Sequence, residues 1–295
     1  MTNEKLDLLR ESLPYIQRFK GKTFVVKFSG KITEDAENLA SLAEELALIH
    51  QVGIRLCIIH GGGKQLSEMA KKLGVVQTVI EGRRVTDDET LDLAKMVFRG
   101  KINTEILAHL RHRGIDAVGL SGIDGGVVNA VRRPPKEISD DQGNKNLIDF
   151  GNVGDIVSVD TRLIELLLSD SYLPVISSLA ADDKGKIFNI NADTVASEIA
   201  VSLHAEKLIL MTDVDGIYKD QADQSTLISR MTVNEMQQMI ETGTATGGMI
   251  PKLQSLMSLL ERGVHSAHII SGQRRNALLS EVFTNKGTGT MLAAF

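Results

Sequence analysis

Three consecutive glycines stand at the junction between an apolar run and a helical pattern. Gly61, Gly62 and Gly63 follow residues 55–60 and precede residues 64–73. Because glycine has no Cβ, its backbone amides can turn toward an anion, and the helix that follows adds the partial positive charge of its N-terminus. The junction therefore predicts a phosphate contact. A tight turn that only packs against a sheet is the alternative interpretation.

Standard phosphate-binding motifs do not account for this junction. A P-loop needs a glycine five residues before Gly-Lys-Ser/Thr, and the pairs Gly30-Lys31 and Gly63-Lys64 do not meet that requirement. The dinucleotide motif G-x-G-x-x-G also fails, because Leu66 stands where its third glycine should be. The pattern indicates another kind of phosphate chemistry.

Two lysines are placed where they could meet a phosphate. Lys27 lies in the strand-like run 23–28, close to Gly30, and α/β sheets bind ligands at the carboxyl ends of their parallel strands. Lys252 falls in the first turn of a helical pattern, at the end of the flexible stretch 244–252. A cation at a helix N-terminus is disfavoured by the helix dipole, so Lys252 predicts a nearby anion. Solvation at the surface is the alternative for both side chains.

A third group of polar residues precedes another helical pattern. Asn189, Asn191 and Asp193 alternate along the chain, so an extended segment would place them on one side, and Asp193 could also cap the helix. Such convergence suits a small polar ligand or the orientation of lysines, and it is a weak signal for a metal. Thr212 and Asp213 close a further strand and could meet the ribose or base of a nucleotide.

The elements that would position these residues alternate between strand-like and helical patterns. That alternation predicts an α/β protein with a mainly parallel sheet. The expected strands are residues 23–28, 55–60, 115–120, 173–178, 207–211 and 267–270. The expected helices are residues 34–52, 64–73, 88–113, 161–169, 193–203, 233–242 and 250–263. Between residues 119 and 160 the pattern favours an antiparallel ribbon with a loop.

The N-terminal segment, residues 1–20, predicts an additional helix before the first strand. Its apolar stripe consists of Leu6, Leu9, Leu13 and Ile16. Pro14 should bend this helix near its middle. The helix could cap the domain or dock on another subunit.

Composition excludes several classes of function. The chain has 295 residues, of which 42% are hydrophobic and 24% charged, so it can bury an ordinary core. A net charge of −5 with 4% aromatic residues and no Trp gives no basic or stacking surface for nucleic acid. No apolar run reaches membrane-spanning length and the N-terminus is acidic, so we expect a cytoplasmic protein without membrane contact. The single Cys57 should be buried, and the histidine spacings predict no metal site.

The motifs together resemble the amino acid kinase family, and the resemblance covers essentially the whole chain. They are Val26-Lys27-Phe28-Ser29-Gly30, His60-Gly61-Gly62-Gly63, Arg84-Val85-Thr86-Asp87, Asn189-Ile190-Asn191-Ala192-Asp193, Thr212-Asp213 and Gly247-Gly248-Met249-Ile250-Pro251-Lys252. The motifs Arg84-Val85-Thr86-Asp87 and Asn189-Ile190-Asn191-Ala192-Asp193 resemble those of members that phosphorylate the side-chain carboxylate of N-acetyl-L-glutamate. The family implies a three-layer α/β/α sandwich around a mostly parallel sheet. It implies one kinase domain, residues 1–295, with an acyl-amino-acid lobe at 21–180 and an ATP lobe at 181–295.

The resemblance also implies roles for individual residues. Catalysis would rest on Lys27, Lys252 and Asp193. The acyl amino acid would contact Gly62, Gly63, Arg84, Asn189 and Asn191. ATP, which would bring Mg²⁺ with it, would contact Lys27, Gly30, Thr212, Asp213, Gly248, Met249 and Lys252. Two residues depart from the family pattern: Ser29 replaces a glycine of the nucleotide loop, and Lys64 replaces a common proline.

The N-terminal helix and the C-terminal stretch resemble an arginine-inhibited, hexameric branch of the family. In that branch the helix interlaces dimers into a ring, and L-arginine binds between the helix and the C-terminal lobe. The resemblance implies an arginine site at His268, Glu281 and Gly287, a homohexamer built as a trimer of dimers, and a PII-type signalling protein as a further candidate partner.

Two alternative functions follow from the same residues. A kinase for a related acylated acid, such as N-acetylaminoadipate or N-succinylglutamate, differs by a binding free energy of only about 1–3 kcal/mol. A catalytically silent arginine-binding module is the other alternative. The presence of Lys27, Asp193 and Lys252 favours a kinase.

Overall fold

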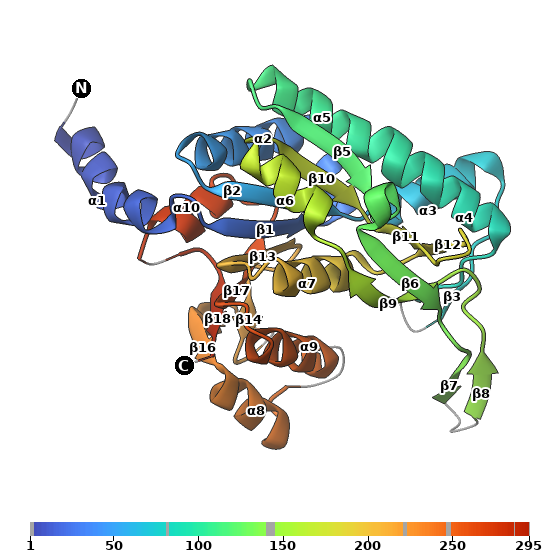
Figure 1. Ribbon diagram of the computed structural model, residues 1–295. Helices are drawn as coiled ribbons and strands as arrows, with labels where there is room; N and C mark the ends of the chain where they lie inside the picture. Colours follow the sequence, from blue (N-terminus) through green and yellow to red (C-terminus); the bar gives the residue numbers. More distant parts are fainter. Residues whose placement is uncertain are drawn as a thin grey trace.

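An eight-stranded sheet runs through the middle of the molecule (Figure 1). The computed structural model describes residues 3–80, 83–139, 145–220, 223–245, 249–285 and 287–294. The strands of this sheet are β1 Thr23–Phe28, β2 Arg55–His60, β5 Ala117–Ser121, β10 Leu173–Ser177, β13 Lys207–Thr212, β16 Arg230–Thr232, β17 Ser266–Ser271 and β18 Thr290–Ala293. Their order is β16-β18-β17-β13-β1-β2-β10-β5, and neighbours are parallel except for the antiparallel pair β17 and β18.

Alternate residues of the central strands point into two separate cores, one on each face of the sheet. In β1, Phe24 and Val26 belong to the first core and Val25 to the second. In β2, Leu56 belongs to the first core and Cys57 to the second. A strand whose two faces are both covered is expected to be mostly apolar, and in β1 and β2 the polar residues are Thr23, Lys27, Arg55 and His60.

Helices cover both faces of the sheet. The first core includes residues of α2 Ala36–Gln51, α3 Gly63–Leu73, α4 Asp88–Ala94, α5 Asn103–His112 and α10 Ala277–Phe283. The second includes residues of α6 Arg162–Ser169, α7 Ala192–Ser202, α8 Val233–Glu241 and α9 Met249–Glu261. Figure 1 shows α2 and α5 above the sheet and α7 and α9 below it. The predicted three-layer α/β/α architecture is confirmed.

The helix predicted for residues 88–113 contains a π-helical segment, Lys95–Ile102, between α4 and α5. Periodicity alone cannot separate π from α geometry over so short a stretch, and π segments occur often at functional sites. The strand predicted to begin at residue 115 begins instead at Ala117. Ile115 lies between α5 and β5, and its N–H donates back to the carbonyl of Leu110 in α5 at 3.1 Å.

The region between residues 119 and 160 contains the expected antiparallel ribbon. Strands β6 Val128–Arg132 and β9 Gly154–Val159 pair antiparallel and form a second sheet with β11 Leu179–Ala181 and β12 Ile187–Asn189. Small hairpins are β3 Val79–Ile80 with β4 Arg83–Arg84, β7 Lys136–Ser139 with β8 Lys145–Ile148, and β14 Ile217–Tyr218 with β15 Leu227–Ile228. The predicted lobe boundary at 180/181 falls inside β11, which pairs with β12. The division into two lobes stays a prediction.

The N-terminal helix, α1 Asn3–Phe19, continues through Pro14 and lies at one end of the molecule (Figure 1). Its last turn packs on the body: Phe19 is 3% exposed, and its ring meets that of Phe24 edge to face at 5.2 Å. The hydroxyl of Tyr15 donates to the side-chain oxygen of Asn285. The end of α1 is thus part of the core, as a helix that caps the domain would be.

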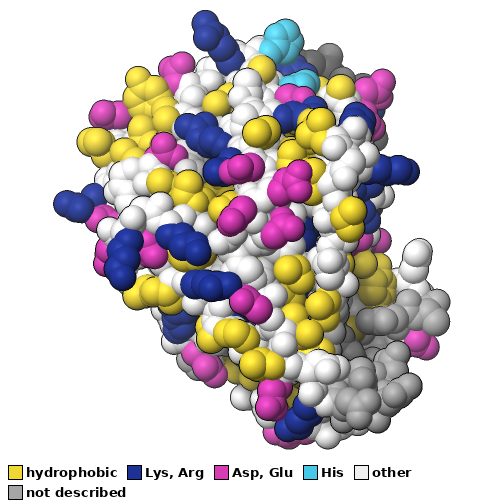
Figure 2. Space-filling view, turned by 90° about the vertical axis from the view of Figure 1, so that its right-hand side faces the viewer, with side chains coloured by type: hydrophobic (Ala, Val, Ile, Leu, Met, Phe, Trp, Pro, Cys, Tyr) yellow, Lys and Arg dark blue, Asp and Glu magenta, His cyan; other side chains and the backbone are white. Residues whose placement is uncertain are grey.

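The surface carries charges of both signs (Figure 2), and the single cysteine, Cys57, is buried. Figure 2 shows basic and acidic side chains lying among one another on one face of the molecule. Among the described residues, no helix combines the length and apolar character that crossing a membrane requires. Cys57 is fully buried, and burial raises the pKa of its thiol to about 12, so it is not a thiolate at neutral pH.

Candidate active site

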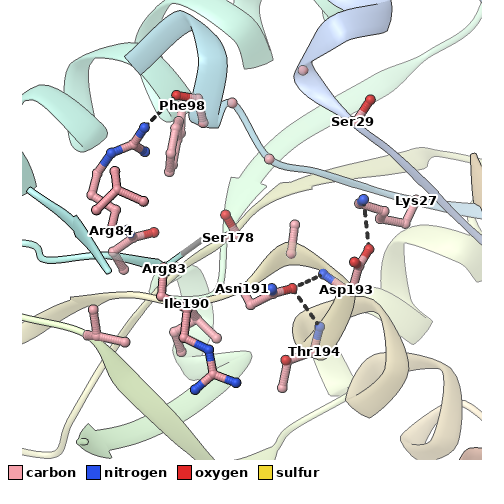
Figure 3. A pocket seen from close by; sticks show the side chains of 18 of the residues that line it. Lys27, Ser29, Arg83, Arg84, Phe98, Ser178, Ile190, Asn191, Asp193 and Thr194 are labelled. Carbon is pink, nitrogen blue, oxygen red and sulfur yellow. Dashed lines mark hydrogen bonds and ion pairs between the residues drawn. The ribbon is translucent and has the colours of Figure 1, made fainter. Parts of the chain in front are cut away.

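A cavity of about 470 Å³ opens at the carboxyl ends of β1 and β2 (Figure 3). Of the residues predicted for the site, it is lined by Lys27, Gly30, Gly62, Gly63, Arg84, Asn189, Asn191 and Asp193. Figure 3 shows the Lys27–Asp193 pair on one side of the cavity and Arg84 with Phe98 on the other. The fold therefore brings together side chains that are separated by as much as 166 positions (27 to 193) in the sequence.

Lys27 and Asp193 form an ion pair across two elements. Lys27, in β1, is 8% exposed, and its Nζ lies 2.7 Å from Oδ1 of Asp193 in the first turn of α7. Asp193 does not cap α7, contrary to one expectation. The cap is Asn191, whose Oδ1 accepts hydrogen bonds from the backbone N–H groups of Asp193 and Thr194 at 2.7 and 3.3 Å. Asn191 at this position leaves the carboxylate of Asp193 available to Lys27.

Lys252 lies in the first turn of α9, close enough to Lys27 and Asp193 for their charges to affect its pKa. Burial lowers the pKa of Lys252, the nearby Lys27 lowers it further, and the carboxylates of Asp193 and Asp213 oppose both effects. Lys252 would gain from an added anion, because its charge is destabilised by burial and by the nearby Lys27. This arrangement agrees with the sequence expectation that Lys252 needs an anionic neighbour.

The glycine turn after β2 is held closely by its neighbours. A Cβ on Gly62 would lie 2.3 Å from Cδ1 of Ile102 and 2.7 Å from Cδ1 of Phe98, both in the π-helical segment. A Cβ on Gly30 would lie 2.2 Å from Oε1 of Gln65, whose Nε2 donates to the carbonyl of Gly30. Packing thus requires glycine at positions 62 and 30. This requirement is independent of any phosphate contact, so that contact stays a prediction.

Arg84 lies at the side of the cavity away from Lys27 (Figure 3), and Asn189 also lines the cavity. Arg84 donates from Nη2 to the carbonyl of Gly63 at 2.8 Å and to Oγ of Ser67 at 2.6 Å, and burial lowers its pKa. Its Nε is buried without a partner among the described residues. Asn189 donates to Oγ1 of Thr86 at 3.3 Å. A half-buried guanidinium with unused donor capacity is suited to binding a carboxylate.

Of the residues predicted to bind ATP, Lys27 and Gly30 line this cavity, whereas Thr212, Asp213, Met249 and Lys252 do not. Thr212 ends β13, Asp213 follows it, and Met249 begins α9. Nζ of Lys31 lies 2.8 Å from Oδ2 of Asp213, and this hydrogen bond lowers the pKa of the carboxyl. Gly248 lies outside the described residues.

Ser29 and Lys64 are the two residues that depart from the family pattern, and the structure shows what lies around each. Ser29 lines the cavity at the start of a 3₁₀ turn, Gly30–Thr33, and its side chain makes no capping hydrogen bond. Lys64 forms an ion pair with Glu34. The positive charge of Lys64 is therefore balanced by a neighbouring carboxylate.

Several residues of the cavity gave no signal in the sequence. These are Arg83, Phe98, Arg133, Ser178, Ile190 and Thr194. Arg133 donates to Asp155 at 2.6 and 2.9 Å and reaches the cavity from the end of β6. Phe98 lies in the π-helical segment and Thr194 in the first turn of α7, whereas the others lie in short hairpins or at strand ends. Spacing in the sequence carries no information on which of these side chains meet.

A second cavity, of about 1310 Å³, lies between α1 and the C-terminal part of the chain. His268, Glu281 and Gly287, predicted as one site, all line it, together with Tyr15, Arg18 and Lys207. A Cβ on Gly287 would lie 2.6 Å from Oε2 of Glu281, and φ there is +58°. Glycine is therefore needed at position 287 on two grounds.

A buried hydrogen-bonded chain forms one wall of the second cavity. Nζ of Lys207 lies 2.9 Å from Nε2 of His268, and Nδ1 of His268 lies 2.6 Å from Oε1 of Glu281. Burial lowers the pKa of Lys207 to about 8 and also lowers that of His268. For Glu281 burial opposes ionisation, but the bonds from His268 and from the N–H groups of Thr288 and Gly289 outweigh it and hold the pKa below its usual value. The sequence gave no reason to include Lys207.

A model of the amino acid kinase family matches residues 22–271. The chain belongs to the amino acid kinase family. Among the curated relatives of this kinase, the acetylglutamate kinase of Methanocaldococcus jannaschii is 45% identical over 289 residues, which cover 98% of this chain and 96% of that protein. The acetylglutamate kinase of Symbiobacterium thermophilum is 43% identical over 289 residues, which cover 98% and 97%.

Solved structures of the same fold include N-acetylglutamate synthase from Neisseria gonorrhoeae. Its complex with coenzyme A and N-acetyl-glutamate superposes on this amino acid kinase with a TM-score of 0.82 at 31% identity, covering 98% of this chain and 63% of that one. Its complex with coenzyme A and L-arginine gives 0.79 at 27% identity, covering 98% and 65%. This kinase thus spans somewhat less than two thirds of the synthase.

Proposed function

We propose that this amino acid kinase transfers the γ-phosphoryl group of ATP to the side-chain carboxylate of N-acetyl-L-glutamate, a step of arginine biosynthesis. The products are N-acetylglutamyl 5-phosphate and ADP. Membership of a kinase family implies ATP as donor. The observation that carries the proposal is the ion pair of buried Lys27 with half-exposed Asp193 beside the glycine turn, in a chain 45% identical to an acetylglutamate kinase over nearly its whole length.

The chemistry needs charge neutralisation more than proton transfer. A carboxylate oxygen of the substrate is already ionised, so it attacks the γ-phosphorus without a general base, and the bond to the β,γ-bridging oxygen breaks to release ADP. Lys27 and Lys252 would stabilise the charge that spreads over the transferred group. Asp193 would hold Lys27 in place through their ion pair and act on Lys252 through its charge.

We propose that the acyl amino acid lies on the Arg84 side of the cavity. Arg84 would bind the α-carboxylate, Asn189 and Asn191 would contact the N-acetyl side, and Gly62 and Gly63 would contact the phosphoryl group. The substrate would thus lie mainly against the lobe at residues 21–180, with Asn189 and Asn191 reaching it from the other lobe. ATP would lie mainly against the lobe at 181–295, at Thr212, Asp213, Gly248 and Met249, with Gly30 reaching it from the first lobe.

We propose that Mg²⁺ arrives with ATP. The described part of the chain holds no group of three or more His, Cys, Asp or Glu side chains that could bind a metal. The carboxylates nearest the site, Asp193 and Asp213, are engaged by Lys27 and Lys31. Such a site fits an ion that is held mainly by phosphate oxygens and water, where it would neutralise phosphate charge.

We propose further that L-arginine binds in the second cavity and inhibits the kinase. The chain Lys207–His268–Glu281 offers a cation for the α-carboxylate at one end and a carboxylate for the guanidinium at the other. A structure of the related synthase contains L-arginine.

We also propose that α1 joins dimers into a hexamer. Binding of a PII-type protein stays a prediction, because no described contact bears on it.

A coupled assay of ADP release tests the catalytic proposal. The purified protein is given ATP, Mg²⁺ and, in separate reactions, N-acetyl-L-glutamate, N-acetylaminoadipate or N-succinylglutamate. We expect the highest kcat/KM with N-acetyl-L-glutamate. A higher value with another acid would redirect the proposal to that substrate, and no turnover with any of them would favour a silent arginine-binding module.

A further inference from the structure

His60 is a fully buried imidazole directly before the glycine turn. It is the last residue of β2, has no exposed surface, and its Nδ1 lies 3.0 Å from the carbonyl oxygen of Gly61. Its Nε2 lies 3.0 Å from Nδ2 of Asn103, at the start of α5. Burial lowers the pKa of His60 to about 4, so the ring is neutral at pH 7. A neutral imidazole carries one proton, and its neighbours decide which nitrogen holds it.

The orientation of Asn103 is fixed independently of His60. Its Nδ2 donates to the carbonyl of Val175 at 3.0 Å, and its Oδ1 accepts from Nη1 of Arg99 at 3.2 Å. Arg99 in turn donates from Nη2 to the carbonyl of Gly119 at 2.9 Å. The amide nitrogen therefore faces Nε2 of His60 as a donor. Nε2 must accept, so the proton of His60 lies on Nδ1 and is donated to Gly61.

This hydrogen bond fixes the peptide that joins Gly61 and Gly62. The described chain contains no cis peptide bond, so the carbonyl of Gly61 and the N–H of Gly62 point in opposite directions. The carbonyl faces the buried imidazole, and His60 is not part of the cavity lining, whereas Gly61, Gly62 and Gly63 are. Without Cβ atoms, glycines on either side leave the peptide free to rotate unless something holds it.

We propose that His60 and Asn103 are positioning residues that hold the N–H of Gly62 toward the cavity, where a transferred phosphoryl group would be bound. The inference rests on the proposed function. The π-helical segment supports it, because Phe98 and Ile102 occupy the space where a Cβ of Gly62 would lie, while Asn103 follows directly after that segment. One helix thus fixes both the position of Gly62 and the orientation of its peptide.

Two substitutions of similar size separate positioning from packing. In His60→Asn the amide nitrogen can stand near the place of Nδ1 and keep the donor to Gly61. In His60→Gln the amide reaches the place of Nε2, and the donor to Gly61 is lost. Gln is nearer to His in volume, so a purely structural role would favour His60→Gln, whereas the positioning role favours His60→Asn.

We expect His60→Gln to lower kcat by roughly 10-fold or more, because a donor to the developing charge loses its orientation. KM for N-acetyl-L-glutamate and for ATP should change less than about threefold, since the contact strengthens only in the transition state. His60→Asn should retain most of kcat. Ser177→Ala is the matched control, because Ser177 is buried, pairs with His60 in the sheet, and its Oγ has no partner among the described residues.

The outcomes separate this inference from the proposed function. No turnover by the wild-type protein contradicts the proposed function. Normal turnover by a folded His60→Gln protein, or a larger loss in His60→Asn than in His60→Gln, overturns this inference alone. A measurement without activity is ¹⁵N NMR of the protein labelled at its imidazole nitrogens, with the His60 signals identified by their loss in either variant. We expect a protonated Nδ1 at pH 7, and a protonated Nε2 overturns the inference even if both variants are inactive.

Discussion

At the scale of single residues, the site is organised by charge rather than by nucleophiles. Lys27 is almost fully buried and is paired with Asp193, and Lys252 lies near both. A buried charge costs several kcal/mol unless it is paired, and here the positive charges of the two lysines and the negative charge of Asp193 stabilise one another. An incoming phosphoryl group would add negative charge beside Lys27 and Lys252 and so stabilise both.

Replacing either lysine by Ala should therefore impair chemistry far more than folding. We expect Lys27→Ala and Lys252→Ala each to lower kcat by roughly 100-fold or more, as when a preorganised electrostatic donor is removed. Steady-state kinetics measure the loss, and circular dichroism checks that each protein is folded. Lys31→Ala is a control, since Lys31 pairs with Asp213 at the exposed edge and should affect kcat much less. Near-normal turnover of a folded Lys27 or Lys252 variant would remove that lysine from the mechanism.

Arg84 allows a second prediction at this scale. Arg84→Lys keeps the charge but loses the two-pronged donor geometry, so KM for N-acetyl-L-glutamate should rise by about 10-fold or more while KM for ATP changes little. The measurement is a pair of substrate titrations. Because Arg84 also donates to Ser67, Ser67→Ala shows how much of the effect comes from that hydrogen bond alone. A rise in KM for ATP instead would mean that Arg84 contacts the nucleotide.

At the scale of elements, a buried carboxylate joins α2 to α10, and α10 lines the second cavity. Glu45 of α2 is 4% exposed and accepts hydrogen bonds from the backbone N–H groups of Asn276, Leu278 and Leu279, at the N-terminus of α10. Burial raises the pKa of Glu45, and these three bonds oppose that rise. Since α10 carries Glu281, the position of the proposed arginine site depends on a side chain from the opposite half of the chain.

Glu45→Gln tests this connection. The amide offers one acceptor oxygen in place of two, so at least one buried N–H of α10 loses its partner and the free energy of unfolding should fall by about 1–3 kcal/mol. Urea denaturation measures it. Glu44→Gln, on the exposed side of the same helix, should change the free energy of unfolding by less than about 0.5 kcal/mol. Equal effects in the two variants would show that the cap of α10 does not contribute.

At the scale of the whole molecule, the N-terminal helix has two parts with different surroundings. Tyr15 and Phe19 pack on the body, and Phe19 belongs to the core. Removing all of residues 1–20 would therefore open the core as well as any contact between subunits. The proposed roles of α1 can be separated by removing only residues 1–14.

We expect deletion of residues 1–14 to reduce a hexamer to dimers while catalysis is retained, because the part of α1 before Tyr15 would carry the ring contact. Light scattering gives the mass, and the ADP assay gives the activity. An unchanged mass after the deletion would leave α1 as a cap of the domain.

In the full chain, Glu281→Gln should weaken inhibition by arginine about 10-fold or more without loss of kcat, since Glu281 lines the second cavity and not the first.

Arginine inhibition should also depend on pH through Lys207. Its pKa is lowered to about 8, so its positive charge is present at pH 7 and largely lost at pH 9. If the α-carboxylate of arginine pairs with this charge, the inhibition constant should rise across that range. Lys207→Arg stays charged and should show a flatter profile. A steeper profile in that variant, or none in the wild type, would contradict the assignment of Lys207.

The sequence by itself determined the class of fold and most of the residues around the first cavity. Strands β1 and β2 agree with the predicted ranges residue for residue, because a parallel strand buried on both faces is an apolar run that ends where the chain turns. Lys27, Gly62, Asn189 and Asp193 stood out because they interrupt or end such runs. Lys27 and Gly62 meet because neighbouring parallel strands β1 and β2 end at one edge of the sheet, whereas Asn189 ends β12 of the second sheet and Asp193 lies in the first turn of α7.

Only the tertiary structure decided which side chains pair, because the partners come from segments that are distant in sequence. The Lys27–Asp193 ion pair, the cap by Asn191, the chain from Lys207 to Glu281 and the link between Glu45 and α10 all depend on contacts between elements. The π-helical segment depends on the same packing, since its apolar pattern is compatible with an ordinary α-helix. Local periodicity records which face of an element is buried and does not record what lies against that face.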